Sequence, residues 1–125
     1  MNLLLDTNVW LWALYEPHRL SPSQAKLIQD PDNGVFVSSI SLWEFTIKRQ
    51  FGKLPVKGDP LQFTQDQGFE VLAFAAEHAV AVEKLPMIHR DPFDRALLAQ
   101  ALVEGLNLLS SDQTLQSYGK VVRLI

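Results

Sequence analysis

Cysteine is absent from this sequence, which excludes disulfide bonds, thiolate metal sites and a cysteine nucleophile. The lack of cysteine suits a reducing compartment, and we expect a cytoplasmic protein. A long apolar run is missing as well, because Asp6 and Asn8 interrupt the N-terminal stretch MNLLLDTNVWLWALY and no basic region precedes it. The sequence therefore predicts neither a signal peptide nor a membrane span.

Positive charge is scarce. The chain has 11 Lys and Arg residues against 14 Asp and Glu residues, a net charge of −3. This balance argues against a general binder of phosphate backbones. A nucleic acid would have to be held by a local basic patch, or through metal ions that neutralise acidic side chains. The length of 125 residues predicts one domain, spanning residues 1–125.

Short apolar runs alternate with longer helical segments along the chain. The apolar runs predict strands at residues 2–5, 35–37, 69–72, 107–109 and 121–124. Capping residues, prolines and glycines bound predicted helices at residues 9–15, from 22, from 39–41 to 52, from 59–60 to 68, 75–84 and 92–104. Strands separated by helices indicate an α/β fold with a mostly parallel sheet covered on both faces.

Four acidic residues occupy special positions relative to these elements. Asp6 and Asp112 each follow a predicted strand, and Glu44 lies early in the helix after the second strand. In parallel sheets the site lies beyond the carboxyl ends of the strands, so we expect these three acids at that edge. Asp94, in the first turn of its helix, joins them only if that helix starts at the same edge, a point the sequence leaves open.

Carboxylates that lie close together repel one another unless a cation or a proton neutralises their charge. Two carboxylates about 4 Å apart repel by roughly 1 kcal/mol in water and by more in a partly buried cleft. Protons or a divalent metal relieve that repulsion. Oxygen ligands without cysteine or a well-spaced histidine pair favour Mg²⁺ or Mn²⁺ over Zn²⁺. Such a site suits metal-assisted attack of water on a phosphodiester.

Each acid also has a structural interpretation. Ser41 and Glu44 form the S-x-x-E pattern of a capping box, and Asp91 before Pro92 is a helix N-cap that places Asp94 in the first turn. Asp6 suits a turn from strand to helix, and Asp112 suits a turn or the cap of residues 113–118. The four acids come from distant parts of the chain, and this independence favours a shared function.

Other polar and aromatic residues carry weaker signals. His89 is isolated in the sequence, which favours a structural role over a ligand role. Three tryptophans with apolar neighbours in helices are expected in the core rather than as platforms for base stacking: Trp10, Trp12 and Trp43. Four cations are expected on a solvated face, with binding to a phosphate backbone as the alternative: Lys48, Arg49, Lys53 and Lys57.

Four segments in order resemble the PIN-domain ribonucleases, and among them the VapC-type toxins of bacterial toxin–antitoxin pairs: LLLDTNVWLWAL, SSISLWEFTIK, LPMIHRDPFDRALLAQA and LLSSDQTLQSYG. The resemblance covers essentially the whole chain. It implies a three-layer α/β/α sandwich with a central parallel sheet and a Mg²⁺- or Mn²⁺-dependent endoribonuclease. The family's four acids fall on Asp6, Glu44, Asp94 and Asp112, as metal ligands and catalytic residues.

The same resemblance implies supporting residues and partners. Asp91 is expected first as a cap and second as an auxiliary acid, and small polar positions near the site fall on Asn8, Ser39 and Ser111. A homodimer and a small antitoxin protein encoded in the same operon are the implied partners, with RNA as substrate. Four basic residues are candidates for contacts to RNA phosphates: Arg90, Arg95, Lys48 and Arg49.

Two alternatives stay open. The chain could be a non-catalytic PIN-like binding module whose role is to form a complex with a partner protein. A different Mg²⁺ enzyme on a doubly wound sheet, such as a phosphatase, ranks well below the endoribonuclease. An aspartyl-phosphate enzyme needs a second Asp close behind its nucleophile, and Thr7-Asn8 after Asp6 offers none.

Overall fold

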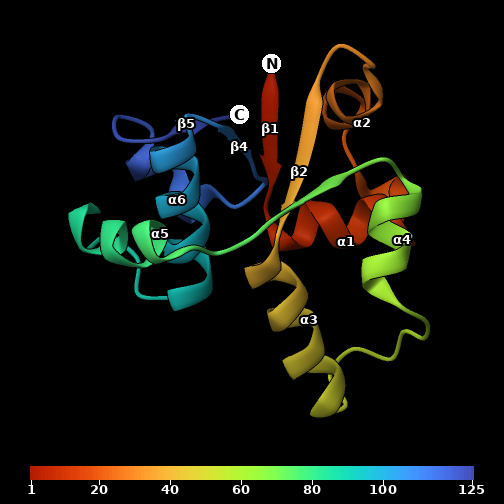
Figure 1. The fold of residues 1–125 in the computed structure, drawn as a ribbon. Helices are drawn as coiled ribbons and strands as arrows, with labels where there is room; N and C mark the ends of the chain where they lie inside the picture. Colours follow the sequence, from red (N-terminus) through yellow and green to blue (C-terminus); the bar gives the residue numbers. More distant parts are fainter.

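The fold is built around a five-stranded sheet in which all neighbouring strands are parallel, in the order β3-β2-β1-β4-β5 (Figure 1). The computed structural model describes residues 1–125. The strands are β1 (Asn2–Leu5), β2 (Gly34–Ser38), β3 (Glu70–Leu72), β4 (Asn107–Leu109) and β5 (Arg123–Leu124). The helices are α1 (Thr7–Tyr15), α2 (Pro22–Gln29), α3 (Ser39–Gln50), α4 (Pro60–Asp66), α5 (Ala76–Ala81) and α6 (Pro92–Glu104). Short 3₁₀ helices lie at Pro17–Arg19, Val82–Lys84 and Gln113–Tyr118.

Helices cover both faces of the sheet, which confirms the α/β/α architecture. Figure 1 shows α1, α2 and α4 on one side of β1 and β2, and α5 and α6 on the other. Each face has its own core, and β1 alternates between them: Leu4 packs with the α6 cluster, while Leu3 and Leu5 pack with Trp10 of α1. This alternation follows from the two-residue period of a strand. No helix is both long and apolar enough to cross a membrane.

The helix boundaries follow local capping chemistry. Ser21 and Gln24 form a capping box at the start of α2, and Asp91 caps α6 with Pro92 at the first helical position. Gly105 ends α6 with φ of 67°, a left-handed conformation that glycine adopts without steric cost. These caps are the signals that fixed the predicted boundaries, and the predicted helix at 92–104 is confirmed to the residue.

The strand order places a binding edge at the centre of the sheet. The chain leaves β1 toward β2 on one side and reaches β4 on the other, so the topology reverses at β1. Ligands in open α/β sheets bind beyond the carboxyl ends of the strands at such a reversal. Helix α6 ends directly before β4 begins, so α6 starts at the carboxyl edge. This resolves the open point and puts Asp94 at the same edge as Asp6.

Candidate metal centre

Asp6 is the most buried of the four acids. It follows β1, is 5% exposed, and caps α1 because its Oδ1 accepts a hydrogen bond from the Val9 amide at 2.8 Å. Its other oxygen accepts a hydrogen bond from the Ser110 hydroxyl at the end of β4. The pKa of Asp6 is raised to about 6, chiefly because of burial. The charges of Asp94 and Asp112 also raise this pKa, and the two hydrogen bonds oppose the rise.

Asp94 lies in the first turn of α6 and is partly buried. Its Oδ2 is 2.8 Å from His89 Nε2, and the helix cap is supplied by Asp91, whose Oδ1 accepts hydrogen bonds from the Phe93 and Asp94 amides. Burial raises the pKa of Asp94, the His89 hydrogen bond opposes the rise, and the charges of Asp91 and Glu44 add to it. His89 is isolated in the sequence, but the fold brings its imidazole onto an acid of the site.

Glu44 projects from the second turn of α3, and its capping-box interpretation is wrong. The cap of α3 is Ser38, whose hydroxyl accepts a hydrogen bond from the Ile40 amide at 3.0 Å. Ser41 lies inside the helix and pairs its buried hydroxyl with that of Thr7 at 2.9 Å. The Glu44 carboxylate, 13% exposed, instead lies 2.9 Å from the Lys48 ammonium group.

Asp112 follows β4 and is exposed. Its Oδ1 accepts hydrogen bonds from the Thr114 amide at 2.9 Å and the Thr114 hydroxyl at 2.7 Å, which confirms it as the cap of the 3₁₀ helix Gln113–Tyr118. No hydrogen bond engages its other oxygen. Asp112 therefore caps a helix and still has one carboxylate oxygen for another contact.

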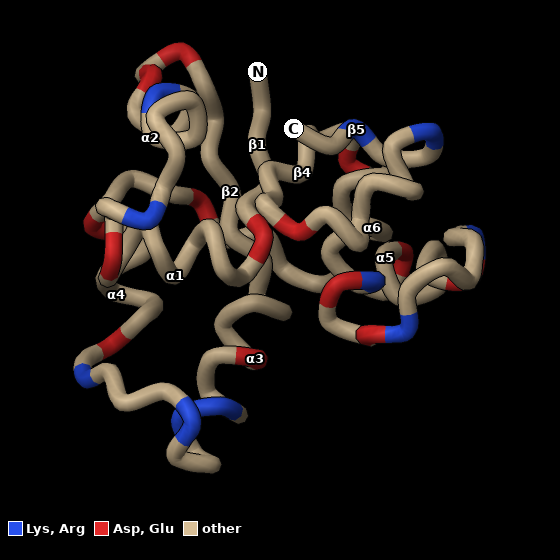
Figure 2. Tube along the Cα trace, turned by 180° about the vertical axis from the view of Figure 1, so that it is seen from behind, with Lys and Arg blue, Asp and Glu red and all other residues tan.

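The four acids lie in one electrostatic neighbourhood. The charges of Asp94 and Asp112 act on Asp6, and the charge of Glu44 acts on Asp94. Figure 2 shows acidic residues at the lower end of β1, on α3 and beside α6. The potential ligand atoms of these four acids do not all lie within 4.8 Å of one another. Two other sets of side chains meet that distance: His89, Asp91 and Asp94, and separately Glu77, His78 and Glu104. Mg²⁺ and Mn²⁺ bind oxygen ligands and keep several water molecules of their own, so a site for either ion does not need all four carboxylates within that distance.

The Glu77 group does not have the chemistry of a metal site. His78 Nδ1 accepts a hydrogen bond from the Ala75 amide at 2.9 Å, so this nitrogen carries no proton. The proton of the neutral ring is therefore on Nε2, which lies 2.8 Å from Glu104 Oε1 and donates to it. No lone pair of His78 is left for a cation.

The small polar residues expected near the site have specific contacts. Asn8 is exposed and lies two residues beyond Asp6 on α1. The Ser39 hydroxyl accepts a hydrogen bond from the Phe74 amide at 3.0 Å, and the Ser111 hydroxyl accepts one from Gln24 Nε2 at 2.6 Å. The serine that touches Asp6 is Ser110, which was not among the expected residues. Side chains alternate between the two faces of a strand, and extending that alternation past the end of β4 could have separated Ser110 from Ser111.

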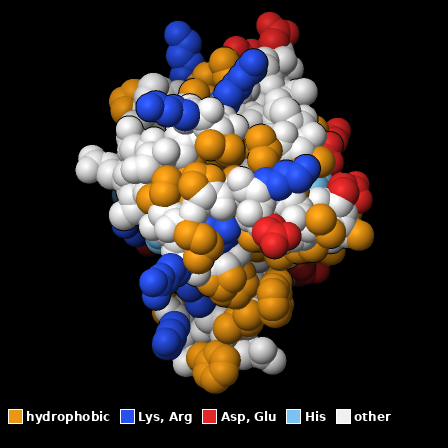
Figure 3. All heavy atoms as spheres, turned by 90° about the vertical axis from the view of Figure 1, so that its left-hand side faces the viewer, with side chains coloured by type: hydrophobic (Ala, Val, Ile, Leu, Met, Phe, Trp, Pro, Cys, Tyr) orange, Lys and Arg blue, Asp and Glu red, His pale blue; other side chains and the backbone are white.

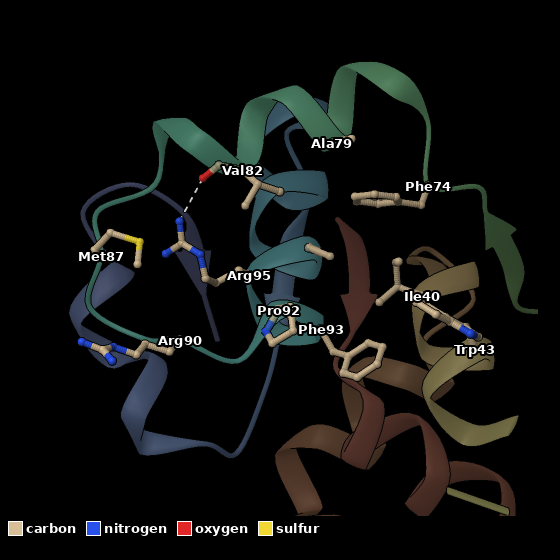
Figure 4. Close-up of a pocket in the computed structure, with 11 residues that line it drawn as sticks. Ile40, Trp43, Phe74, Ala79, Val82, Met87, Arg90, Pro92, Phe93 and Arg95 are labelled. Carbon is tan, nitrogen blue, oxygen red and sulfur yellow. Dashed lines mark hydrogen bonds between the residues drawn. The ribbon is translucent and has the colours of Figure 1, made fainter. Parts of the chain in front are cut away.

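The four expected phosphate contacts divide into accessible and occupied side chains. Arg90 is exposed and lines an apolar cavity of about 480 Å³ (Figure 4). Lys48 pairs with Glu44, and Arg49 donates to the Gly58 carbonyl at 2.8 Å. Arg95 is buried at 7% exposure and its guanidinium group donates to backbone carbonyls, so the expected phosphate contact of Arg95 is wrong.

Trp10 is buried in the core, whereas Trp43 is exposed. Trp10 is fully buried, as expected, and donates to the Thr64 hydroxyl at 2.9 Å. Trp43 is 57% exposed, so its expected core position is wrong; it packs edge-on against Phe93 with ring centroids 5.4 Å apart. Figure 3 shows hydrophobic side chains gathered on the lower half of the face that carries α5 and α6, and the exposed Met87 and Ile88 add to the apolar surface of the chain.

A comparison with protein families identifies the fold. Residues 3–121 match the PIN domain. The chain belongs to the PIN domain family. This PIN domain is similar to Ribonuclease VapC22 of Mycobacterium tuberculosis, with 27% identity over 120 residues that cover 94% of this chain and 92% of that protein.

Solved structures share the same PIN fold. The toxin–antitoxin complex VapBC2 of Rickettsia felis, bound to a promoter DNA fragment, has a chain with a TM-score of 0.72 and 18% identity, covering 100% of this chain and 98% of that one. FitAcB of Neisseria gonorrhoeae contains a chain with a TM-score of 0.62 and 21% identity, covering 98% of this chain and 96% of that one. At these identities the similarity establishes the fold alone.

Proposed function

We propose that this PIN domain is a metal-dependent endoribonuclease that cleaves RNA phosphodiester bonds, and that residues 1–125 form a single PIN-like domain. The observation that carries the proposal is the raised pKa of Asp6, to about 6, beside the charges of Asp94 and Asp112. An enclosed carboxylate with acidic neighbours gains most from a divalent cation. The similarity to Ribonuclease VapC22 supports the choice of RNA as substrate.

The residues proposed to hold Mg²⁺ or Mn²⁺ are Asp6, Asp94 and Asp112, with Glu44 as a further ligand directly or through water. A bound divalent cation supplies positive charge that acidifies water and stabilises the charge developing on phosphodiester oxygens. The hydrogen bond from Ser110 holds the Asp6 carboxylate in a fixed orientation at the end of β1. Asp94 opens α6 and Asp112 follows β4, so both lie at the same edge of the sheet as Asp6, where their carboxylates would complete a set of oxygen donors.

The cations of the chain have a separate role in this proposal. A net charge of −3 disfavours RNA binding, so phosphates need local basic groups. Arg90 is the accessible candidate beside the site, and Lys48 and Arg49 lie on α3 one to two turns beyond Glu44. Figure 2 shows basic residues at the far end of α3 and in the segment after it.

We also infer that this PIN domain is one member of a toxin–antitoxin pair. Structural neighbours of this chain include VapBC complexes of a toxin with its antitoxin. By analogy, this PIN domain acts as the toxin, forms a homodimer, and is inhibited by a small antitoxin encoded in the same operon. Expression without that antitoxin is expected to arrest growth, and co-expression to restore it.

Cleavage of RNA in the presence of Mg²⁺ or Mn²⁺ tests the catalytic proposal. We expect cleavage by the wild-type protein, loss of cleavage in EDTA, and loss of cleavage in Asp6→Asn. Cleavage that resists both the chelator and Asp6→Asn would overturn metal dependence. If the wild-type protein binds the antitoxin yet neither binds Mn²⁺ nor cleaves RNA, the chain is instead a non-catalytic binding module.

A further inference from the structure

The segment between the 3₁₀ helix Val82–Lys84 and α6 begins at Leu85, which is buried in the core, but few apolar contacts hold the three residues that follow it. Pro86, Met87 and Ile88 are all exposed, and Met87 is 74% exposed. A segment with so little buried apolar surface opens at low cost unless hydrogen bonds fix it. The same segment carries His89, which contacts Asp94 of the proposed metal centre.

Tyr118 supplies hydrogen bonds to this segment from beneath. Its ring is fully buried in the core of the α6 face. Its hydroxyl donates to the Pro86 carbonyl at 2.8 Å and accepts from the Ile88 amide at 3.2 Å and the His89 amide at 2.9 Å. A phenolic hydroxyl has one donor and two acceptor positions, so these three contacts fill its capacity. Arg95 Nη1 makes a further, longer contact to the same oxygen at 3.3 Å, which links Tyr118 directly to Arg95.

Arg95 holds the same segment from α6. Its guanidinium group donates to the carbonyls of Val82 at 3.1 Å and Pro86 at 3.0 Å, with longer contacts to Leu85 and His89 at 3.5 and 3.4 Å. Figure 4 shows this side chain directed toward the Val82 carbonyl. Arg95 forms no ion pair with an acid, although it is buried. A buried cation is costly unless hydrogen bonds compensate it, and here backbone carbonyls do so.

His89 is therefore fixed through its backbone on both sides. Its amide donates to Tyr118, its carbonyl accepts from Arg95, and its imidazole Nε2 lies 2.8 Å from Asp94 Oδ2. We propose that Tyr118 and Arg95 are positioning residues that act through His89 to orient the Asp94 carboxylate toward the bound divalent cation. This inference rests on the proposed function, because it concerns how a ligand of the proposed metal centre is held.

Residues that orient metal ligands typically change metal affinity by ten- to a hundredfold when they are altered. Tyr118→Phe removes only the hydroxyl and leaves the buried ring in place. We expect it to raise the Mn²⁺ dissociation constant about tenfold, measured by calorimetry on the full chain. Its RNA cleavage rate should recover at saturating Mn²⁺, because the ligands themselves are intact.

The matched control is Thr64→Val, which removes a buried hydroxyl on α4. Thr64 is fully buried, accepts a hydrogen bond from Trp10 at 2.9 Å and donates to the Pro60 carbonyl, on the opposite face of the sheet from Tyr118. We expect it to lower the melting temperature in EDTA as much as Tyr118→Phe does, while the Mn²⁺ dissociation constant stays unchanged. Equal Mn²⁺ affinities for the two variants would reduce Tyr118 to a structural role and overturn the inference.

A double-mutant cycle tests the route through His89. His89→Ala alone should weaken Mn²⁺ binding, and adding Tyr118→Phe or Arg95→Lys should weaken it no further. Additive losses would overturn the proposed route. Absence of Mn²⁺ binding by the wild-type protein would overturn the proposed function together with this inference, whereas wild-type binding that Tyr118→Phe leaves unchanged overturns only the inference.

Discussion

The Ser110 hydroxyl donates a hydrogen bond to Asp6 Oδ2 and so joins the end of β4 to the end of β1, 104 residues apart in sequence. This contact lies at the point where the strand order reverses, between the two strands whose ends carry Asp6 and Asp112. It lowers the pKa of Asp6, while burial and acidic neighbours raise it. The Ser110 hydroxyl therefore helps to keep Asp6 ionised near neutral pH, against the effects of burial and of the neighbouring acids.

Ser110→Ala should move the pH dependence of metal binding upward. Without the hydroxyl, the pKa of Asp6 rises above its present value of about 6, so a larger fraction of the carboxyl is protonated at mildly acidic pH. Because a cation needs the ionised form, we expect Mn²⁺ binding at pH 6.5 to weaken about tenfold, since hydrogen bonds to charged groups contribute about 1.5–3 kcal/mol. Binding should recover toward the wild-type value at pH 8.

The neighbouring serine provides the control for this variant. Ser111→Ala removes a hydroxyl that accepts from Gln24 and has no hydrogen bond with Asp6. Titrations of Mn²⁺ binding between pH 6 and pH 8 should give the wild-type curve for Ser111→Ala. Identical curves for both variants would mean that Ser110 does not control the ionisation of Asp6.

Asp6→Asn should stabilise the metal-free protein at neutral pH. The pKa of Asp6 in the folded protein is raised from 3.8 to about 6, so the stability that protonation of Asp6 gives is fully present below about pH 3.8 and is lost as the pH rises through 6. A pKa difference of that size corresponds to roughly 3 kcal/mol. Asparagine keeps an oxygen for the cap of α1 and carries no charge, so we expect a gain of about 1–3 kcal/mol at pH 8.

Urea unfolding in EDTA at pH 4, 6 and 8 measures this difference. The wild-type protein should lose stability relative to Asp6→Asn between pH 4 and pH 8. Adding Mn²⁺ should then stabilise the wild-type protein but leave Asp6→Asn unchanged, because only a ligand bound to the folded state shifts the equilibrium. An Asp6→Asn protein that is less stable than wild type at pH 8 in EDTA would show that the Asp6 charge is not destabilising.

Much of this site could be predicted because its residues follow strands or open helices. A carboxylate directly after β1, such as Asp6, must lie at the carboxyl edge of the sheet, and the same topological rule places Asp112 after β4. The cap at Asp91 is encoded by local chemistry within a few residues, so its position could also be predicted.

Side-chain contacts between distant segments could not be predicted. Ser41 and Glu44 have the spacing of a capping box, yet the cap of α3 lies three residues earlier at Ser38. Ser38 is the last residue of β2, and its hydroxyl accepts a hydrogen bond from the Ile40 amide. His89 contacts Asp94 only because residues buried elsewhere fix its backbone. Trp43 and Trp10 have similar local sequences, but α3 extends beyond the edge of the sheet (Figure 1), where no layer covers Trp43.

Lys48→Met should tighten metal binding and weaken RNA binding. Lys48 lies 2.9 Å from Glu44, so a cation that uses Glu44 competes with the ammonium group. The pair is partly exposed, and such pairs contribute about 0–1 kcal/mol, so we expect the Mn²⁺ dissociation constant to fall about two- to fivefold. RNA affinity should fall, and with a smaller dependence on salt, because one phosphate contact is lost.

Lys53→Met is the charge-matched control for Lys48→Met. It removes the same charge from the segment after α3 without breaking an ion pair to Glu44. If both variants change the Mn²⁺ dissociation constant equally, the effect is one of net charge, and Glu44 is not a ligand. Glu44→Gln alone should raise the Mn²⁺ dissociation constant. Adding Lys48→Met to Glu44→Gln should then leave that constant unchanged.

Asp91 and Asp94 differ in role although they are three residues apart, and substitutions should separate them. Asp91 Oδ1 caps α6, so Asp91→Ala should lower stability by about 1 kcal/mol, while Asp91→Asn keeps a capping oxygen and stays near wild type. RNA cleavage at saturating Mn²⁺ should persist in both. The Asp94 carboxylate accepts no hydrogen bond from the helix amides, and burial penalises its charge. Asp94→Asn should therefore leave the melting temperature in EDTA unchanged or raise it. The same variant should lose RNA cleavage and the stabilisation by Mn²⁺; loss of both on Asp91→Asn instead would assign the metal to Asp91.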